Sequence, residues 1–126
     1  MKVTENDLFK CMKVLGKISE KNMPGKLAVA IINNRKALDS SFKALDEIIS
    51  KTAQKYVEKD DNANPTIKNG KYVISKENQA KFDAELEEIG QQEVEIPELT
   101  KIDISLFEEV SEISVADIYG ISIMIK

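Results

Sequence analysis

Residues 26–59 read KLAVAIINNRKALDSSFKALDEIISKTAQKYVEK and contain neither glycine nor proline. Apolar and small side chains recur in this segment at steps of mostly three and four residues, which places them on one face of a single helix. At about 1.5 Å per residue, that helix would be about 50 Å long. It cannot cover its own apolar face, so we expect the rest of the chain or a second copy to cover it. The face consists of Ala28, Ile31, Leu38, Phe42, Leu45, Ile49, Thr52 and Tyr56.

Arg35 stands where strict heptad spacing expects an apolar residue, next to Asn33 and Asn34. A polar group in such a face can fix the register or the oligomeric state. Alternatively, the helix rotates or bends there and Arg35 reaches water; both interpretations stay open. We expect this face to contact a partner or a second copy, and a twofold dimer is the commonest outcome. The candidate interface residues are Ile31, Arg35, Leu38, Phe42, Leu45, Ile49 and Tyr56.

A shorter helix is predicted before residue 20, with Thr4 as its N-cap and Asp7 three residues later. Cys11, the single cysteine, falls on the apolar side of this helix, and we expect it to be a buried side chain. The opposite side carries a row of lysines. With Arg35, these lysines are candidates for binding an anion or a phosphate-bearing ligand. The row consists of Lys10, Lys13, Lys17 and Lys21.

Two observations argue against nucleic acid as a partner. No aromatic residue is interleaved with the lysines for base stacking, and the net charge of the chain is −4. The row of lysines then either keeps this helix soluble or contacts the acidic segment of a neighbouring molecule.

A turn and a hairpin follow the long helix. The sequence DDNANP (residues 60–65) ends the helix, because these side chains compete for backbone hydrogen bonds and Pro65 cannot continue it. Residues 66–74 then form a predicted β-hairpin in which Asn69 and Gly70 supply the two positive φ angles of a type I′ turn. An isolated hairpin is marginal in water, so it should dock on helices or gain a strand.

Three elements are predicted in the remainder of the chain. Ser75 caps a third helix that ends near Ile89, with Gly90 as its terminator and an acidic outer face. Residues 92–96 alternate like a half-buried strand, and residues 101–104 are a second candidate strand. Ser114 resembles the N-cap of a closing helix over residues 115–125, although the β-branched residues there leave a strand possible. Gly120 would permit a close approach of backbones.

The predicted fold is α+β and mainly α. It combines a helical hairpin with one long helix (about 26–59), a small β-hairpin (about 66–74), a third helix (about 76–89) and a short C-terminal helix. We expect a single domain, 1–126, of uneven charge. Residues 1–60 form the helical hairpin and hold twelve Lys and Arg against eight Asp and Glu, or +4; residues 61–126 hold six against fourteen, or −8.

The residue types favour binding over catalysis. The chain has no histidine, which removes the usual general base at neutral pH and the commonest metal ligand. Its five glycines never cluster into a phosphate-binding loop. We therefore predict a non-enzymatic protein without cofactor or metal. No run approaches 18 apolar residues, so we expect no membrane contact, and a start without an apolar core predicts a cytoplasmic protein.

From Ala37 onward, the chain resembles small proteins of unknown function that bacteriophage and prophage genomes encode. The resemblance lies in layout and rests on YVEKDDNANP (56–65), the Asn-Gly hairpin ending at Tyr72, FDAELEEI (82–89), EVEI (93–96) and DIYGISIMI (117–125). It implies an accessory protein in the cytoplasm of the infected bacterium that binds and blocks a host component, such as a defence system. One alternative is a scaffold or chaperone in virion assembly. Another is a sponge for a nucleotide immune signal, with Lys10, Lys13, Lys17 or Arg35 holding phosphates.

Overall fold

A computed structural model of the chain describes residues 1–126 and is built along one 32-residue helix, α2 (Gly25–Tyr56). The long helix predicted over 26–59 is therefore confirmed, although it ends three residues earlier. It ends there because Val57 adopts an extended conformation and forms a bridge with Ile74, while the Glu58 N–H donates to the Val73 carbonyl oxygen at 2.7 Å.

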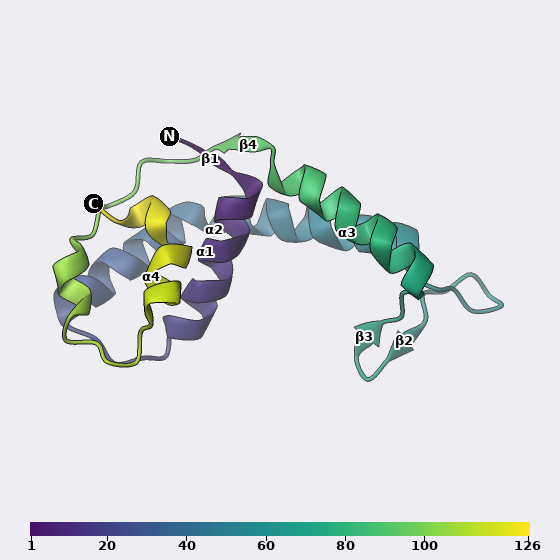
Figure 1. Cartoon of the computed structure of the whole chain (residues 1–126), viewed down its shortest axis with the longest axis horizontal. Helices are drawn as coiled ribbons and strands as arrows, with labels where there is room; N and C mark the ends of the chain where they lie inside the picture. Colours follow the sequence, from purple (N-terminus) through teal and green to yellow (C-terminus); the bar gives the residue numbers. More distant parts are fainter.

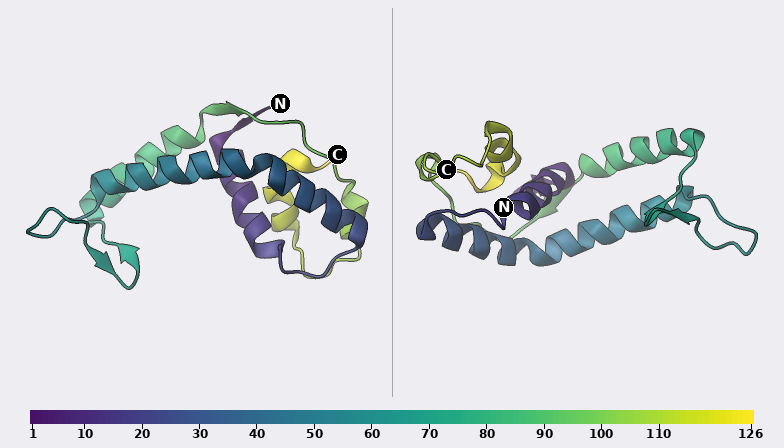
Figure 2. Two further views of the ribbon diagram at one scale, coloured as in Figure 1. Left: turned by 180° about the vertical axis from the view of Figure 1, so that it is seen from behind. Right: turned by 90° about the horizontal axis from the view of Figure 1, so that it is seen from below.

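The other helices divide between the two halves of α2 and give the molecule the shape of an arch (Figures 1 and 2). The helix α1 (Glu5–Ile18) crosses the N-terminal half, and α4 (Val115–Gly120) packs on α1. The helix α3 (Lys76–Gly90) runs back along the C-terminal half of α2. We call residues 46–90 the arm, and residues 1–45 together with 91–126 the lobe. The mainly α, α+β class predicted from the sequence is confirmed.

Two small antiparallel sheets complete the fold. In the lobe, β1 (Lys2–Thr4) pairs with β4 (Glu93–Glu95), with Val3 opposite Val94. At the end of the arm, β2 (Ile67–Lys68) and β3 (Lys71–Tyr72) form the predicted hairpin. Its turn has φ 54° at Asn69 and 76° at Gly70, as a type I′ turn requires.

The sequence missed one strand and predicted another that does not form. The strand predicted near residues 92–96 is confirmed as β4, but its partner β1 was not expected. The strand predicted over 101–104 is wrong: Ile102 makes a single bridge to Ile125, and a 3₁₀ turn, η1 (Ile104–Phe107), follows. The closing helix is shorter than 115–125, because it ends at Gly120 and a second 3₁₀ turn, η2 (Ser122–Met124), continues the chain.

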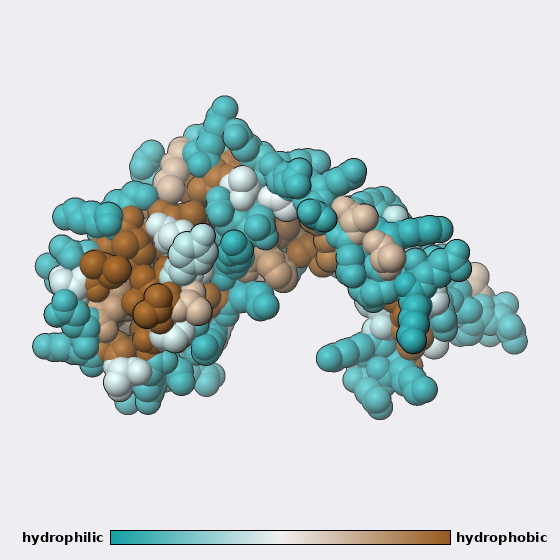
Figure 3. Space-filling view, in the orientation of Figure 1, coloured by the Kyte–Doolittle hydropathy of each residue, from teal (hydrophilic) through white to brown (hydrophobic).

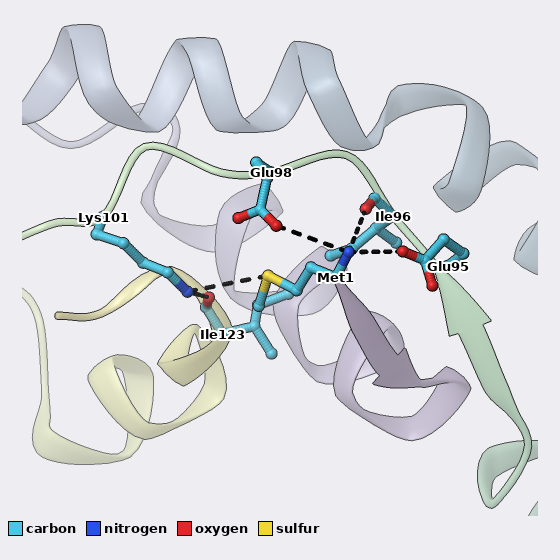
Figure 4. Close-up of polar contacts among 6 residues, drawn as sticks. All are labelled: Met1, Glu95, Ile96, Glu98, Lys101 and Ile123. Carbon is cyan, nitrogen blue, oxygen red and sulfur yellow. Dashed lines mark hydrogen bonds and ion pairs between the residues drawn. The ribbon is translucent and has the colours of Figure 1, made fainter.

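Polar contacts tie the first residue to the segments around it (Figure 4). The Met1 amino group donates to Glu95 Oε1 at 2.7 Å and to the Ile96 carbonyl oxygen at 3.2 Å. Lys101 Nζ donates to the Ile123 carbonyl oxygen at 2.8 Å and lies 3.9 Å from the Met1 sulfur. These contacts hold the segment after β4 against the C-terminal turns.

The apolar core lies in the lobe. Helix α1 contributes Leu8, Cys11, Leu15 and Ile18, and α2 contributes Leu27, Ile31, Leu38 and Leu45. Residues 96–124 supply most of the other side of the core. In contrast, no residue of α3 is buried, so the arm has almost no core of its own.

The interruption in the apolar face of α2 falls at Asn34 and not at Arg35. Arg35 is exposed, whereas Asn34 is only 1% exposed and bonds to the backbone of Thr100. Within the single chain Arg35 reaches water, as one of its two interpretations expected. Gly90 was expected to follow the last residue of α3 as its terminator, but it is itself the last helical residue, and Gln91 is the C-cap.

Candidate interaction surfaces

Helix α4 is fixed on α1 by local and long-range contacts. Ser114 is the N-cap of α4, as the sequence predicted, and it forms a capping box with Asp117, which is only 5% exposed. Lys17 Nζ donates to both carboxylate oxygens of Asp117, at 3.0 and 3.3 Å. The backbone N–H of Ser114 and the Lys17 ammonium hold the pKa of Asp117 below its usual value of 3.8, so the carboxylate stays charged at neutral pH.

Gly120 brings the end of α4 against α1. A Cβ atom added at this position would lie 2.6 Å from Cγ2 of Val14. Gly120 thus permits a close approach, but the nearest atom that it meets belongs to the Val14 side chain and not to another backbone, and only glycine fits there without a shift.

The packing of α4 on α1 creates a surface of aromatic, aliphatic and basic side chains. We call it the α1–α4 surface, and it consists of Lys10, Lys13, Val115 and Tyr119. Val115 is 84% exposed and Tyr119 is 71% exposed. Lys10 Nζ lies 5.7 Å from the centroid of the Tyr119 ring, within range of a cation–π contact. A shallow depression between α1 and α4 runs past Lys10, Lys13, Ala116 and Tyr119.

The predicted row of lysines lies along α1, but its members have different surroundings. Lys10 and Lys13 form no ion pair, and Lys13 Nζ lies 5.7 Å from the Phe9 ring centroid. Lys17 is paired with Asp117, and Lys21 lies 3.7 Å from a carboxylate oxygen of Glu112.

Arg35 does not join Lys10 and Lys13. It lines a separate depression of about 100 Å³ between α1 and α2, together with Lys21. The five candidate anion ligands therefore do not converge on one site, and only Lys10 and Lys13 belong to the α1–α4 surface.

A second feature lies where the arm meets the lobe, and we call it the arm-root groove. Its volume is about 270 Å³, and it lies between the start of α1, the middle of α2 and the end of α3. Phe9, Leu45, Ile49 and Leu86 form its apolar floor, and three carboxylates surround them: Glu5, Asp83 and Glu87. Figure 3 shows the hollow between the lobe and the β2–β3 hairpin, with apolar atoms beneath the arch.

Glu5 is the carboxylate in this groove with an incomplete hydrogen-bond shell. Its Oε2 atom is buried and has no hydrogen-bond partner. Burial raises the pKa of Glu5 above its ordinary value of 4.5, because a charged carboxylate loses hydration there. A cation brought to the groove would stabilise this group.

The predicted interface residues of α2 divide into two groups. Ile31, Leu38 and Leu45 are buried in the core of the lobe, so the same chain covers them, contrary to their proposed role in an interface. Leu45 and Ile49 line the arm-root groove, and Phe42 is half-buried. Tyr56 is also half-buried and donates its hydroxyl to Glu85 Oε2 at 2.6 Å.

Sequence reasoning did not single out Val115 and Tyr119, because the closing helix was expected to pack deeply or against a partner as a whole. Their spacing of four residues held a signal, since i and i+4 positions share a helix face. Cys11 is buried as predicted, and burial raises its pKa to about 12, so its thiol stays protonated.

Comparison with protein-family models, with curated proteins and with solved structures finds no match to this chain. None of its helices combines the length and the apolar composition needed to cross a membrane.

Proposed function

We propose that this protein acts by stoichiometric binding to another protein, without catalysis, and that the α1–α4 surface is the contact. The observation that supports this proposal is the exposure of Tyr119 and Val115 on α4, a helix that its N-cap and the Lys17–Asp117 ion pair hold in place. Tyrosine is enriched among residues that dominate binding energy, and a rigid surface loses little conformational entropy on binding.

The chemistry of the α1–α4 surface favours an acidic partner. Lys10 and Lys13 are exposed and carry no ion pair within the chain. A partner that places carboxylates beside an apolar depression for the Tyr119 ring would satisfy both kinds of side chain. Such charge complementarity increases the association rate and makes it sensitive to salt.

The resemblance to phage-encoded proteins supports a cellular setting for this binding. In that setting, the chain is an accessory protein in the cytoplasm of an infected bacterium, and it blocks a host component such as a defence system. Blocking needs only a stable contact at the right place on the target.

A plating assay tests this proposal. The protein is expressed in bacterial strains that each carry one defence system, and the plating efficiency of a sensitive phage is measured. Wild type should restore plating on one such strain, and Tyr119→Ala should abolish the effect. Ile104→Ala is the matched control, because Ile104 is a 56% exposed apolar residue outside the surface, and this variant should retain the effect. Full activity of Tyr119→Ala, or turnover of a substrate by the pure protein, would contradict the proposal.

One observation favours a second candidate, the binding of a nucleotide signal. The Tyr119 ring beside Lys10 offers an aromatic face for a base next to an ammonium group for a phosphate. A ligand at about 100 times its Kd would stabilise the fold by about 2.7 kcal/mol, which is measurable as a rise in Tm. Cyclic dinucleotides and ADP-ribose are the probes. A rise that Lys10→Ala and Tyr119→Ala both abolish would favour this candidate over protein binding.

A further inference from the structure

We propose that the arm-root groove binds the β2–β3 hairpin of a second copy of this chain. Two molecules would pair arm against arm about a twofold axis, each placing its hairpin in the groove of the other. This contact uses different residues from the α1–α4 surface.

The hairpin presents an apolar pair that its own chain leaves uncovered. Ile67 and Tyr72 are direct partners across the two strands, so their side chains lie on the same face of the hairpin. They are 61% and 43% exposed. A two-stranded hairpin is marginal by itself in water, so a surface that covers this pair would stabilise it.

The charges of the hairpin and the groove are opposite. Residues 66–74 contain Lys68 and Lys71, which also pair across the strands, and no acidic residue. The groove carries Glu5, Asp83 and Glu87 around an apolar floor. An incoming lysine would bring positive charge to the groove in which Glu5 Oε2 lacks a partner. Neighbouring residues of a strand point to opposite faces, so Lys68 and Lys71 lie on the other face of the hairpin from Ile67 and Tyr72. With Ile67 and Tyr72 on the apolar floor, the long lysine side chains would reach back along the edges of the hairpin to the carboxylates at the rim of the groove.

The arrangement of the arm permits reciprocal contact. The hairpin and the hollow between lobe and arm lie on the same, concave side of the arch (Figures 1 and 3). Leu45 in the groove and Tyr56 at the end of α2 are eleven residues apart, or about 16 Å along the helix. Two antiparallel arms related by a twofold axis midway along this distance would place each hairpin at the other groove. Such a pair is closed and does not extend into a fibre.

The second copy would also cover the arm. No residue of α3 is buried within one chain, although Phe82, Leu86 and Ile89 face α2 or the groove. Pairing of two arms would bring four helices together, the arrangement in which such apolar faces are normally buried.

Charge reversal provides a sharp test, because the two sides of the contact can be changed separately. One variant carries Asp83→Lys and Glu87→Lys, so that its groove and its hairpin are both basic. The other carries Lys68→Glu and Lys71→Glu, so that both are acidic. All four residues are exposed, so both variants should fold, which circular dichroism checks.

Sedimentation equilibrium should show a dimer for wild type and a dimer Kd raised by about 100-fold for each variant alone. An equimolar mixture of the two variants should form a heterodimer.

Three further variants complete the experiment. Glu108→Lys with Glu109→Lys makes the same change in net charge as Asp83→Lys with Glu87→Lys, but at exposed positions outside the groove, and it should leave the dimer intact. Ile67→Ser should weaken the dimer without any change in charge. Tyr119→Ala should leave the dimer intact even where it abolishes binding of the partner, so the two proposals fail separately. A wild-type monomer at every concentration, a dimer that both charge variants retain, or a mixture that stays monomeric would overturn the inference.

Discussion

Asn34 lies on the buried face of α2 and satisfies two backbone groups from the other end of the sequence. Its Nδ2 donates to the Thr100 carbonyl oxygen at 2.9 Å, and the Thr100 N–H donates to its Oδ1 at 2.7 Å. The Asn34 side chain therefore makes the two hydrogen bonds that the backbone of a neighbouring β-strand would otherwise make with Thr100. We expect Asn34→Ala to lower the free energy of unfolding by about 2 kcal/mol, because it leaves these groups without their partner and opens a space in the core. Urea denaturation measures the difference.

Asn33 supplies the control for this substitution. It is adjacent to Asn34 on the same helix but exposed, and Asn33→Ala should change the free energy of unfolding by less than about 0.5 kcal/mol. Equal effects of the two substitutions would contradict the role assigned to Asn34.

Replacement of Gly120 and of Gly16 by alanine should change the free energy of unfolding in opposite directions. Gly120→Ala places a methyl group 2.6 Å from Val14 Cγ2, and it should lower the free energy of unfolding by about 1–3 kcal/mol. Gly16 lies inside α1 with nothing within 4 Å of an added Cβ, so Gly16→Ala should raise the free energy of unfolding by about 0.5–1 kcal/mol. Thermal denaturation of both variants gives the comparison. Val14→Ala should partly rescue Gly120→Ala, and failure of that rescue would mean that the clash lies elsewhere.

Helix α4 is an element that its contacts hold in place, since six residues are too few for a stable helix in water. The pKa of Asp117 is lowered by the Ser114 N–H and by Lys17, so its contribution to stability is present above its unfolded pKa of about 3.8. This contribution is lost as the pH falls through the lower pKa of the folded state. We therefore expect Asp117→Asn to be less stable than wild type at neutral pH and the difference to shrink below about pH 4.

Urea denaturation at neutral and acid pH checks this expectation. Glu112→Gln is the control, because the Glu112–Lys21 pair is longer, at 3.7 Å, and the Glu112 side chain is 61% exposed. An exposed pair of this kind contributes little, so its removal should change stability little at either pH. A constant difference between Asp117→Asn and wild type across the pH range would show that the charge of Asp117 does not stabilise α4.

The elements that the sequence predicted well are those whose signals are local. The N-caps at Thr4, Ser75 and Ser114 bond to residues three positions later. The positive φ angles of Asn69 and Gly70 form the turn that joins the two strands of the hairpin. Such signals are readable because the side chain and the backbone group that it satisfies lie within one turn of chain.

The features that the sequence did not reveal join distant residues. The strand β1 pairs with β4 about ninety residues away, and the buried Asn34 meets Thr100. The same holds for the α1–α4 surface: the lysines were visible as a row, but Lys10 and Tyr119 come together only after folding. No spacing rule connects positions so far apart, because their contact depends on how the helices pack.

At the scale of the whole molecule, the lobe and the arm differ in what they bury. The lobe contains nearly all of the buried apolar residues, whereas α3 contains none. Opening of the arm in one chain therefore exposes little apolar surface, and its free energy should be well below that of global unfolding.

Hydrogen exchange should reveal this difference and also its dependence on concentration. In dilute protein, the amides of α3 should exchange faster than those of α1, because α1 places four residues in the core. If two arms pair, mass action should slow exchange in α3 and the β2–β3 hairpin as concentration rises, while exchange in α1 stays the same. The variant with Lys68→Glu and Lys71→Glu should lose this concentration dependence and keep the difference between α1 and α3. An arm as protected as α1 in dilute protein would mean that the two packed helices are stable without a second copy, and the reason for expecting arm-to-arm pairing would be gone.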